Sequence, residues 1–395
     1  MPQRVIPTTA LMRPIADFSH AAMIDDVIYV GALAGTDADR QFGGTVPGRH
    51  DTENQARRMF DNLEIALGQM GARLDDLVQL KTYLVDLRDI DLYRRVFDER
   101  FGEAAPAHAV AGSWHFPLPQ ATIELDAIAI KGGGARRHRS ADLPPLPSGG
   151  PNAGLTAGGF HAVTALPLRA DGTSPEGDAA AQCALVLENL HRALRAAGLD
   201  PSTLFRLHVT IADPRLLPVF DQVFAAVAPR PYPARTVTAV ALERADLLVQ
   251  LEALAAPGGF HPIGAAQPWL GPASPAALVG ETLFTSAQQG LDAGGPWRDA
   301  QAQADTAWDR TEALLGEAGM GPGTVLRTNN ALSHWQLFPA FNRAYGPRVA
   351  WPFPPRTTIL AALGDPMAQV QIEVIARRRA EEAAILQVPP EAPAS

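Results

Sequence analysis

Arginine, histidine and glutamate side chains recur at matching places along the chain, and they are the residues best suited to chemistry. A proline-rich turn leads into Arg235 and again into Arg356, and a shorter Pro-Ala turn leads into His108. A planar guanidinium can donate two parallel, charge-assisted hydrogen bonds to one carboxylate, which a lysine cannot match. Both arginines are therefore candidate carboxylate-binding groups, and His108 takes the place of the arginine once.

A strand near the end of each matching region carries a second candidate group. The three strands contain Glu124, Gln250 and Gln371 at corresponding positions. A glutamate can accept and return a proton, whereas a glutamine can orient a water molecule but cannot take its proton. Of these three side chains only Glu124 could transfer a proton, whereas the two glutamines could only bind a ligand or a water molecule. We expect the carboxylate two residues further along each strand to point to the opposite face of the sheet.

The spacing of these residues shows that one unit is written three times. Gly71, Gly198 and Gly319 each end a helical pattern and stand at the same distance before the histidine or arginine. An aromatic column keeps its offset without a gap, at Phe97, Phe224 and Tyr345. Internal repeats of this kind decide the fold, because each copy is one structural unit.

Each copy predicts the element order β-β-α-β-α-β-β. Apolar residues at alternating spacings of four and three indicate helices at 51–70 and 178–197, and β-branched runs indicate the strands. We expect an α+β fold with both helices on one face of the sheet. The predicted domains are 5–131, 152–256 and 260–378, with a Gly- and Pro-rich linker at 132–151 and a frayed tail after residue 378.

The composition excludes several classes of protein. The 395 residues carry a formal net charge of −9, which argues against nucleic acid as the main partner. One cysteine cannot form an intrachain disulfide framework, and no apolar run reaches the length of a membrane span. The sequence contains neither a metal-ligand pattern nor a nucleophile elbow. We therefore expect a cytoplasmic protein that uses no metal and no cofactor and binds neither membrane nor nucleic acid.

Taken together, the motifs resemble the RidA/YjgF family. They are an Asn-Leu pair in the helix (Asn62-Leu63 and Asn189-Leu190), the Pro-Ala-Arg turn, and a closing strand of alternating glutamate and aliphatic residues. The resemblance covers nearly the whole chain, three times over. Members of the family are small chorismate-mutase-like subunits that form trimers with ligand sites in the clefts between subunits. The resemblance thus implies three tandem domains that form an intramolecular pseudo-trimer.

The resemblance also implies roles for individual positions. In the family, the arginine holds the substrate carboxylate and the strand glutamate polarises the attacking water. The family's helix asparagine corresponds to Arg94, Asp221 and Asn342, and its strand-end serine to Gly31, Thr164 and Ser286. The third copy is therefore the most family-like ligand pocket, with Ser286, Asn342 and its arginine. The first copy is the expected seat of new chemistry, with Glu124 as the catalytic general acid and base acting together with His108, and no single copy keeps both the arginine and the glutamate.

Many members of this family hydrolyse reactive imines or enamines of amino acids to keto acids and release ammonia. By resemblance we expect a cofactor-free hydrolase of the imine or enamine deaminase type. It would hydrolyse or rearrange a small carboxylate-bearing imine, enamine or enol ether at an inter-domain cleft, in a specialised biosynthetic pathway. A chorismatase-like hydrolase or cyclase, since chorismatases carry the same domain, and a non-catalytic carboxylate-binding protein are the alternatives. We expect the chain to be a monomeric pseudo-trimer whose partner is a small carboxylate-bearing molecule.

Overall fold

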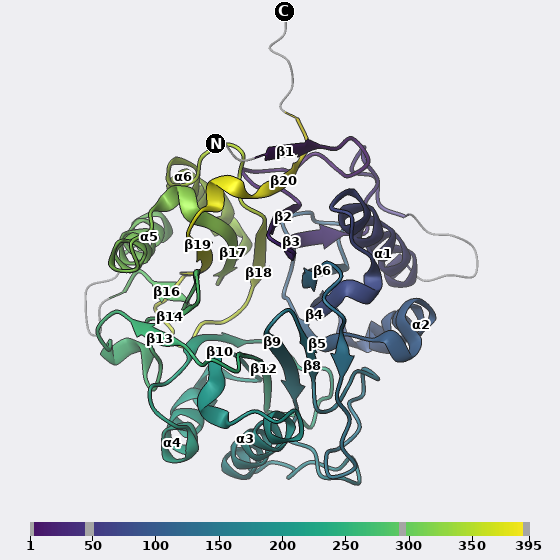
Figure 1. The fold of residues 1–395 in the computed structure, drawn as a ribbon, viewed down its shortest axis with the longest axis vertical. Coiled ribbons are helices and arrows are strands. Elements are labelled where there is room, and N and C mark those ends of the chain that lie inside the picture. The colour runs from purple at the N-terminus through teal and green to yellow at the C-terminus, as the bar shows by residue number, and fades with distance from the viewer. Residues whose placement is uncertain (1–3, 44–50, 292–297, 390–395) are drawn as a thin grey trace, which may run out of the picture.

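The three copies fold into three α+β units, each with one β-sheet and two α-helices. The computed structural model describes residues 4–43, 51–291 and 298–389, and Figure 1 shows the units arranged around a common centre. The helices lie at the rim and the sheets face inward. The predicted fold class, three tandem α+β units, is thereby confirmed.

The sheet of the first unit contains the predicted strands in the hydrogen-bonded order β2-β3-β6-β4-β5. The elements of this unit are β2 (Ala21–Ile24), β3 (Val27–Ala34), α1 (Asp51–Gln69), β4 (Leu77–Leu84), α2 (Ile90–Phe101), β5 (Ala107–Gly112) and β6 (Ile123–Ile130). β4 and β5 run parallel, and the other neighbours are antiparallel. The helix α2 connects β4 to β5. β5 carries His108 and lies at the edge of the sheet.

The other two units repeat this plan. The second contains β8 (Leu155–Ala157), β9 (Phe160–Ala165), α3 (Ala179–Ala196), β10 (Leu204–Ile211), α4 (Leu217–Val227), β11 (Ala234–Ala239) and β12 (Val249–Ala255). The third contains β13 (His261–Ile263), β14 (Ala276–Val279), β15 (Thr282–Thr285), β16 (Gln288–Gln289), α5 (Ala300–Glu317), β17 (Val325–Leu332), α6 (Phe338–Tyr345), β18 (Arg356–Leu360) and β19 (Val370–Arg377). In each unit the parallel edge strand, β11 or β18, carries the predicted arginine.

Two kinds of apolar core stabilise this arrangement. Within the first unit, the two helices pack on the sheet, and Phe60 of α1 stacks on Tyr93 of α2 with ring centroids 6.0 Å apart. Between the units, the sheets meet in a shared core that includes Tyr29, Phe205 and Phe284, one from each unit. Burial of apolar surface is the dominant favourable term in folding. The shared core therefore joins the three units into one body.

A ring of buried ion pairs also links the units. The pairs are Lys81 with Glu252, Arg206 with Glu373 at 2.5 Å, and Arg327 with Asp126 at 2.5 Å, each between two different units. These acids are the carboxylates that follow the candidate strand positions by two residues. The expectation that they point to the opposite face was wrong, because alternate residues of a strand share a face. Gln371 and Glu373 accordingly line one small cavity together.

The C-terminal segment closes the ring. β20 (Ala384–Gln387) lies between β1 (Arg4–Pro7) and β2 in the sheet of the first unit. The side-chain amide of Gln387 also donates a hydrogen bond to the backbone carbonyl of Phe18 at 3.1 Å. The expectation of a frayed tail was therefore wrong for 384–387, since these residues complete a sheet. The predicted linker similarly contributes β7 (Arg136–Arg137), which pairs with β8.

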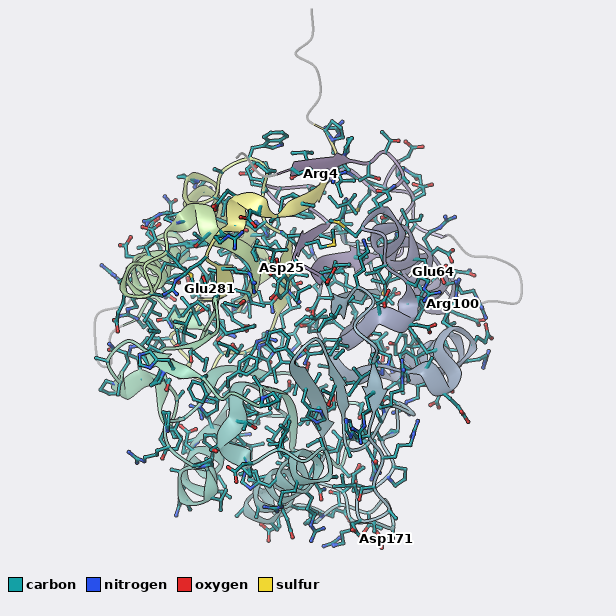
Figure 2. All side chains as sticks on the ribbon, viewed as in Figure 1. Arg4, Asp25, Glu64, Arg100, Asp171 and Glu281 are labelled. Carbon is teal, nitrogen blue, oxygen red and sulfur yellow. The ribbon has the colours of Figure 1, made fainter. Side chains whose placement is uncertain are left out.

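Ion pairs at the rim contribute much less than the cores. Figure 2 shows Glu64 and Arg100 beside each other where α1 meets α2, with Arg100 Nη1 3.5 Å from Glu64 Oε2. Both side chains are partly exposed. Ion pairs in such positions are typically worth at most about 1 kcal/mol. The buried contacts between sheets, rather than the rim, hold the units together.

We expect the chain to be a monomer at micromolar concentration. The three units already bury their inner sheet faces against one another, and fusion gives their association an effective concentration of about millimolar. Light scattering should therefore give the mass of one chain across a dilution series. A mass three times that of the chain would contradict this expectation.

Candidate functional site

Each interface between units places the arginine strand of one unit against the opening strands of the next. A Cβ at Gly31 would lie 2.7 Å from the backbone nitrogen of Arg356, so this close approach requires glycine. At the next interface Ser286 fills the matching place: its hydroxyl accepts a hydrogen bond from the Arg235 backbone N–H and donates one to the Ser274 carbonyl, each at 2.7 Å. Every cleft is therefore built from two units.

This arrangement combines the candidate residues across units. The pairs that share a cavity are Arg356 with Glu124 and Arg235 with Gln371. At the third interface β5, the strand of His108, contacts β9 of the second unit, and by the same arrangement we expect Gln250 to be the matching residue there. One cleft thus contains the arginine and the glutamate that no single copy keeps.

The grouping of site residues by copy was wrong on two points. Glu124 and His108 lie on strands β6 and β5, which β4 separates in the sheet. Ser286 lies beside Arg235 rather than in the pocket of Asn342 and the third copy's arginine. The physical reason is the same in both cases: each pocket is completed by the neighbouring unit and not by its own.

Arg356 is a buried cation without an acidic partner. Its side chain is 3% exposed, and Nη1 donates a hydrogen bond to Asn342 Oδ1 at 2.8 Å. Among the residues that the structure describes, none forms an ion pair with it. Burial lowers the pKa of this arginine from its ordinary value, and the charge of Asp17, which makes no ion pair with it in the described residues, opposes that shift in part. Because a buried charge is costly unless it is paired, the guanidinium favours an incoming anion.

Aromatic side chains hold the Arg356 guanidinium in place. Ring centroids lie 4.6–5.7 Å from its central carbon, and they belong to Phe18, Phe338, Phe341 and Tyr345. Phe18 comes from the first unit, and the other three project from α6 at helical spacing. Cation–π attraction partly replaces the lost hydration of the cation. The sequence analysis did not single out the three α6 rings as site residues, although their spacing of three and four residues places them on one helix face.

Glu124 lies in the same cavity with its carboxyl group free. The cavity has a volume of about 30 Å³, and apolar side chains including Met12, Ile15 and Leu118 form most of its wall. Glu124 is 5% exposed, and within the described part of the chain it has no hydrogen-bond partner. Burial raises its pKa to about 8. At neutral pH the group is therefore mostly protonated and can donate a proton.

Arg235 differs from Arg356 because an acidic side chain balances its charge. It forms an ion pair with Asp221, and Nη2 donates a hydrogen bond to the Leu270 carbonyl at 2.5 Å. Asp221 occupies the helix position that Asn342 holds in the third unit. Gln371, which faces the same cavity, donates a hydrogen bond to the Val237 carbonyl at 3.1 Å. An internal carboxylate therefore already neutralises the arginine of this cleft.

His108 is enclosed rather than presented to a ligand. It is 1% exposed, stacks on Phe97 with ring centroids 4.3 Å apart, and shares a 2.8 Å hydrogen bond with the Tyr93 hydroxyl. Burial lowers its pKa to about 3, so the imidazole is neutral at physiological pH. Gln250 at this interface is fully buried, and its amide atoms have no partner among the described residues. These features suit a packed interface more than an acid–base pair.

The composite clefts and the three-fold repetition define a protein of three fused subunits of one fold. The sequence profile of the family described as Endoribonuclease L-PSP matches residues 8–131, 152–257 and 265–378. The chain belongs to this family and carries its domain three times. The resemblance to the RidA/YjgF family, in three copies, is thereby confirmed.

Individual relatives match one unit at a time. A RutC family protein of Pyrococcus abyssi is 33% identical over 131 residues, which make up 33% of this chain and 99% of the relative. A 2-iminobutanoate/2-iminopropanoate deaminase of Mus musculus is 27% identical over 130 residues, or 33% of this chain and 93% of that protein. A crystal structure of a chorismatase covers 76% of this chain and 93% of its own, with a TM-score of 0.56 and 12% identity. The last likeness shows a shared fold.

The described residues contain neither a membrane-spanning helix nor a metal-binding cluster. None of the helices there is both long and apolar enough to cross a membrane. No group of three or more His, Cys, Asp or Glu side chains in those ranges could hold a metal ion. The clefts described above remain the candidate sites.

We expect Glu124 to make the stability of the protein depend on pH. The folded state raises the pKa of this carboxyl to about 8, so between the ordinary pKa and that value the folded state binds more protons than the unfolded state. This contribution to the free energy of unfolding is fully present at low pH and is lost as pH rises through about 8. Urea denaturation of wild type and Glu124→Gln at pH 5 and pH 9 measures it. The stability of wild type relative to the variant should fall over this range, and an unchanged difference would show that Glu124 titrates normally.

Proposed function

We propose that the chain is an enzyme that hydrolyses a small 2-imino acid, or its enamine tautomer, to the 2-oxo acid and ammonia. The reaction takes place in the cleft between the third and first units. One observation carries the proposal: a buried arginine without an acidic partner, Arg356, faces the same cavity as Glu124, a carboxyl group whose burial raises its pKa. The first group suits a substrate carboxylate and the second suits proton transfer.

Binding begins with the substrate carboxylate at Arg356. Asn342 accepts from one nitrogen of the guanidinium and leaves its other N–H groups for the ligand. Two parallel hydrogen bonds fix the plane of the carboxylate. The adjacent imine carbon then lies in the apolar part of the cavity, where bulk water is excluded. Only a small side chain fits beside it.

Glu124 then moves protons in both directions. Its carboxyl group first donates a proton to the imine nitrogen, which makes the carbon electrophilic, and the resulting carboxylate takes a proton from the attacking water. The water oxygen forms its bond to carbon and gives a neutral carbinolamine. Glu124 next protonates the amine, the C–N bond breaks with release of ammonia, and Glu124 recovers the hydroxyl proton as the carbonyl forms. The overall change is one water consumed and one ammonia released, with Glu124 returned to its starting form.

The size of the cavity bears on the alternatives. A volume of about 30 Å³ holds about two water molecules, so flexible wall residues such as Met12 must shift even for a small substrate. A ring as large as that of chorismate requires much more rearrangement, which disfavours the chorismatase-like alternative at this cleft. The free carboxyl group of Glu124 disfavours a purely binding role. The name of the mouse relative supports imine hydrolysis, and divergence of the three clefts supports a dedicated pathway enzyme.

Arg356→Ala should lose most of the affinity for 2-oxobutanoate, a product-like carboxylate. Each hydrogen bond to a charged group is worth about 1.5–3 kcal/mol, so loss of the fork weakens binding by at least about ten-fold. Arg356→Lys should recover only part of the affinity, because the fork geometry is lost. Titration calorimetry measures both variants.

Asn342→Asp is the matched control for this binding experiment. It places beside Arg356 the same residue type that pairs with Arg235 in the second unit. The new carboxylate should neutralise the guanidinium and weaken 2-oxobutanoate binding while the arginine itself stays in place. Undiminished affinity in both Arg356→Ala and Asn342→Asp would exclude Arg356 as the carboxylate anchor.

Glu124→Gln should lower the rate of ammonia release from 2-iminobutanoate by about 10²–10⁴, the usual size of general acid–base assistance. The change is nearly isosteric, and two of the three units already carry glutamine at this strand position, so the fold and 2-oxobutanoate binding should persist. For wild type, kcat/KM should fall as pH rises through about 8, because the reaction starts from protonated Glu124. Full activity of Glu124→Gln, with the same alkaline limb, would place the chemistry elsewhere.

A further inference from the structure

The interface of the second and third units contains a much larger cavity than the Arg356 cleft. Its volume is about 270 Å³, enough for a small organic molecule. Its polar side chains are Arg235, Gln289, Asp365 and Gln371. Leu217, Leu291 and Trp269 contribute apolar surface. The function proposed above makes no use of this space.

The positive charge of Arg235, the arginine of this cavity, is already balanced by an acidic side chain. Asp221 pairs with its guanidinium, and the Leu270 carbonyl accepts a further hydrogen bond. Gly271, in the left-handed region at φ 63°, lies directly against this ion pair. A Cβ at this position would lie 2.5 Å from Asp221 Oδ2 and 2.9 Å from Arg235 Nη2. The ion pair is therefore packed in place from the third unit. A ligand carboxylate would have to displace Asp221 and would meet its repulsion.

The remaining polar groups of the cavity suit an uncharged ligand. Gln371 uses its Nε2 to donate to the Val237 carbonyl, which leaves its oxygen as an acceptor. The side-chain amide of Gln289 makes no hydrogen bond within the described ranges and can both donate and accept. Asp365 adds a carboxylate, whose charge opposes a second anion. Adjacent donor and acceptor groups on a neutral ligand, as in a primary amide, match this set, with Trp269 as an apolar wall.

We propose that this cavity is a second binding site, for a small uncharged ligand with an amide-like donor–acceptor edge, and that Asp221 is the residue that excludes carboxylates from it. The two clefts then differ in ligand class because one helix position holds Asp221 in one and Asn342 in the other. An amide oxygen at this position leaves the arginine's charge available, whereas a carboxylate cancels it. The inference stands on the contacts of this cavity and does not depend on the chemistry proposed for Glu124.

A matched pair of probes tests the inference: 2-oxobutanoate and its amide, 2-oxobutanamide. Crystals of the full chain are soaked with each probe at the same concentration, and calorimetry gives the number of sites. We expect the amide, and not the acid, in the cavity beside Gln289. Asp221→Asn, which recreates the residue pair of the third unit, should admit the acid beside Arg235 and add one acid-binding site per chain. Gln289→Leu should weaken amide binding by about ten-fold, the effect of losing one hydrogen bond.

Three results would overturn the inference. They are the acid occupying this cavity in the wild-type chain, neither probe occupying it, and Asp221→Asn folding without gaining an acid site. If Asp221→Asn does not fold, the wild-type soaks and Gln289→Leu still decide the question. If the Arg356 cleft fails to bind 2-oxobutanoate, the occupancy of the cavity beside Gln289 can still be read, because the crystal structure identifies which cavity is filled.

Discussion

The head-to-tail contact between neighbouring units is the constraint from which the clefts follow. The edge strand that carries the arginine of one unit lies against the opening strands of the next, close enough that Gly31 has no room for a side chain beside Arg356. Such a contact closes a ring when it is repeated three times. The shared apolar core and the buried ion pairs, such as Arg327 with Asp126, fix the direction of the ring. The residue on the last strand of a unit therefore lies in the cleft of the preceding unit's arginine, as Glu124 does with Arg356 and Gln371 with Arg235.

Fusion into one chain allows the three clefts to differ. In a ring of identical subunits, symmetry would give each cleft the same residues. Here the helix position beside each arginine or histidine holds Asn342, Asp221 or Arg94 in turn. Asn342 leaves the charge of its arginine available, Asp221 cancels it, and Arg94 pairs with Glu243 across the interface at 2.9 Å. One position thus sets a different electrostatic character for each cleft.

Much of the fold could be read from the sequence because the repeats share their spacing. The glycine and aromatic columns align the register of all three units, and the sequence names Arg356, Glu124 and Asn342 as candidate site residues. Which of these residues share a cleft could not be predicted, because spacing within a copy carries no information on which neighbouring unit completes a pocket. Burial was equally hidden: His108 looks reactive as a residue type, but its stacking on Phe97 depends on tertiary packing.

Other misses have local physical causes. The strand Ala384–Gln387 was taken for part of a frayed tail because its pairing partners lie at the opposite end of the chain. The ion pair of Arg235 and Asp221 joins an edge strand to a helix, so it required the folded distance between them. The carboxylates of the ion-pair ring stand two residues after the candidate positions and therefore share their face of the sheet, as Gln371 and Glu373 do in one cavity.

A crystal structure of Glu124→Gln with 2-oxobutanoate tests the composite cleft most directly. The structure predicts the ligand carboxylate on Arg356 of the third unit and its 2-oxo group within hydrogen-bond reach of residue 124 of the first, about 2.6–3.2 Å between heavy atoms. This single geometry requires both units to form one site. Ligand bound at Arg356 but turned away from residue 124, or bound only at another interface, would contradict it.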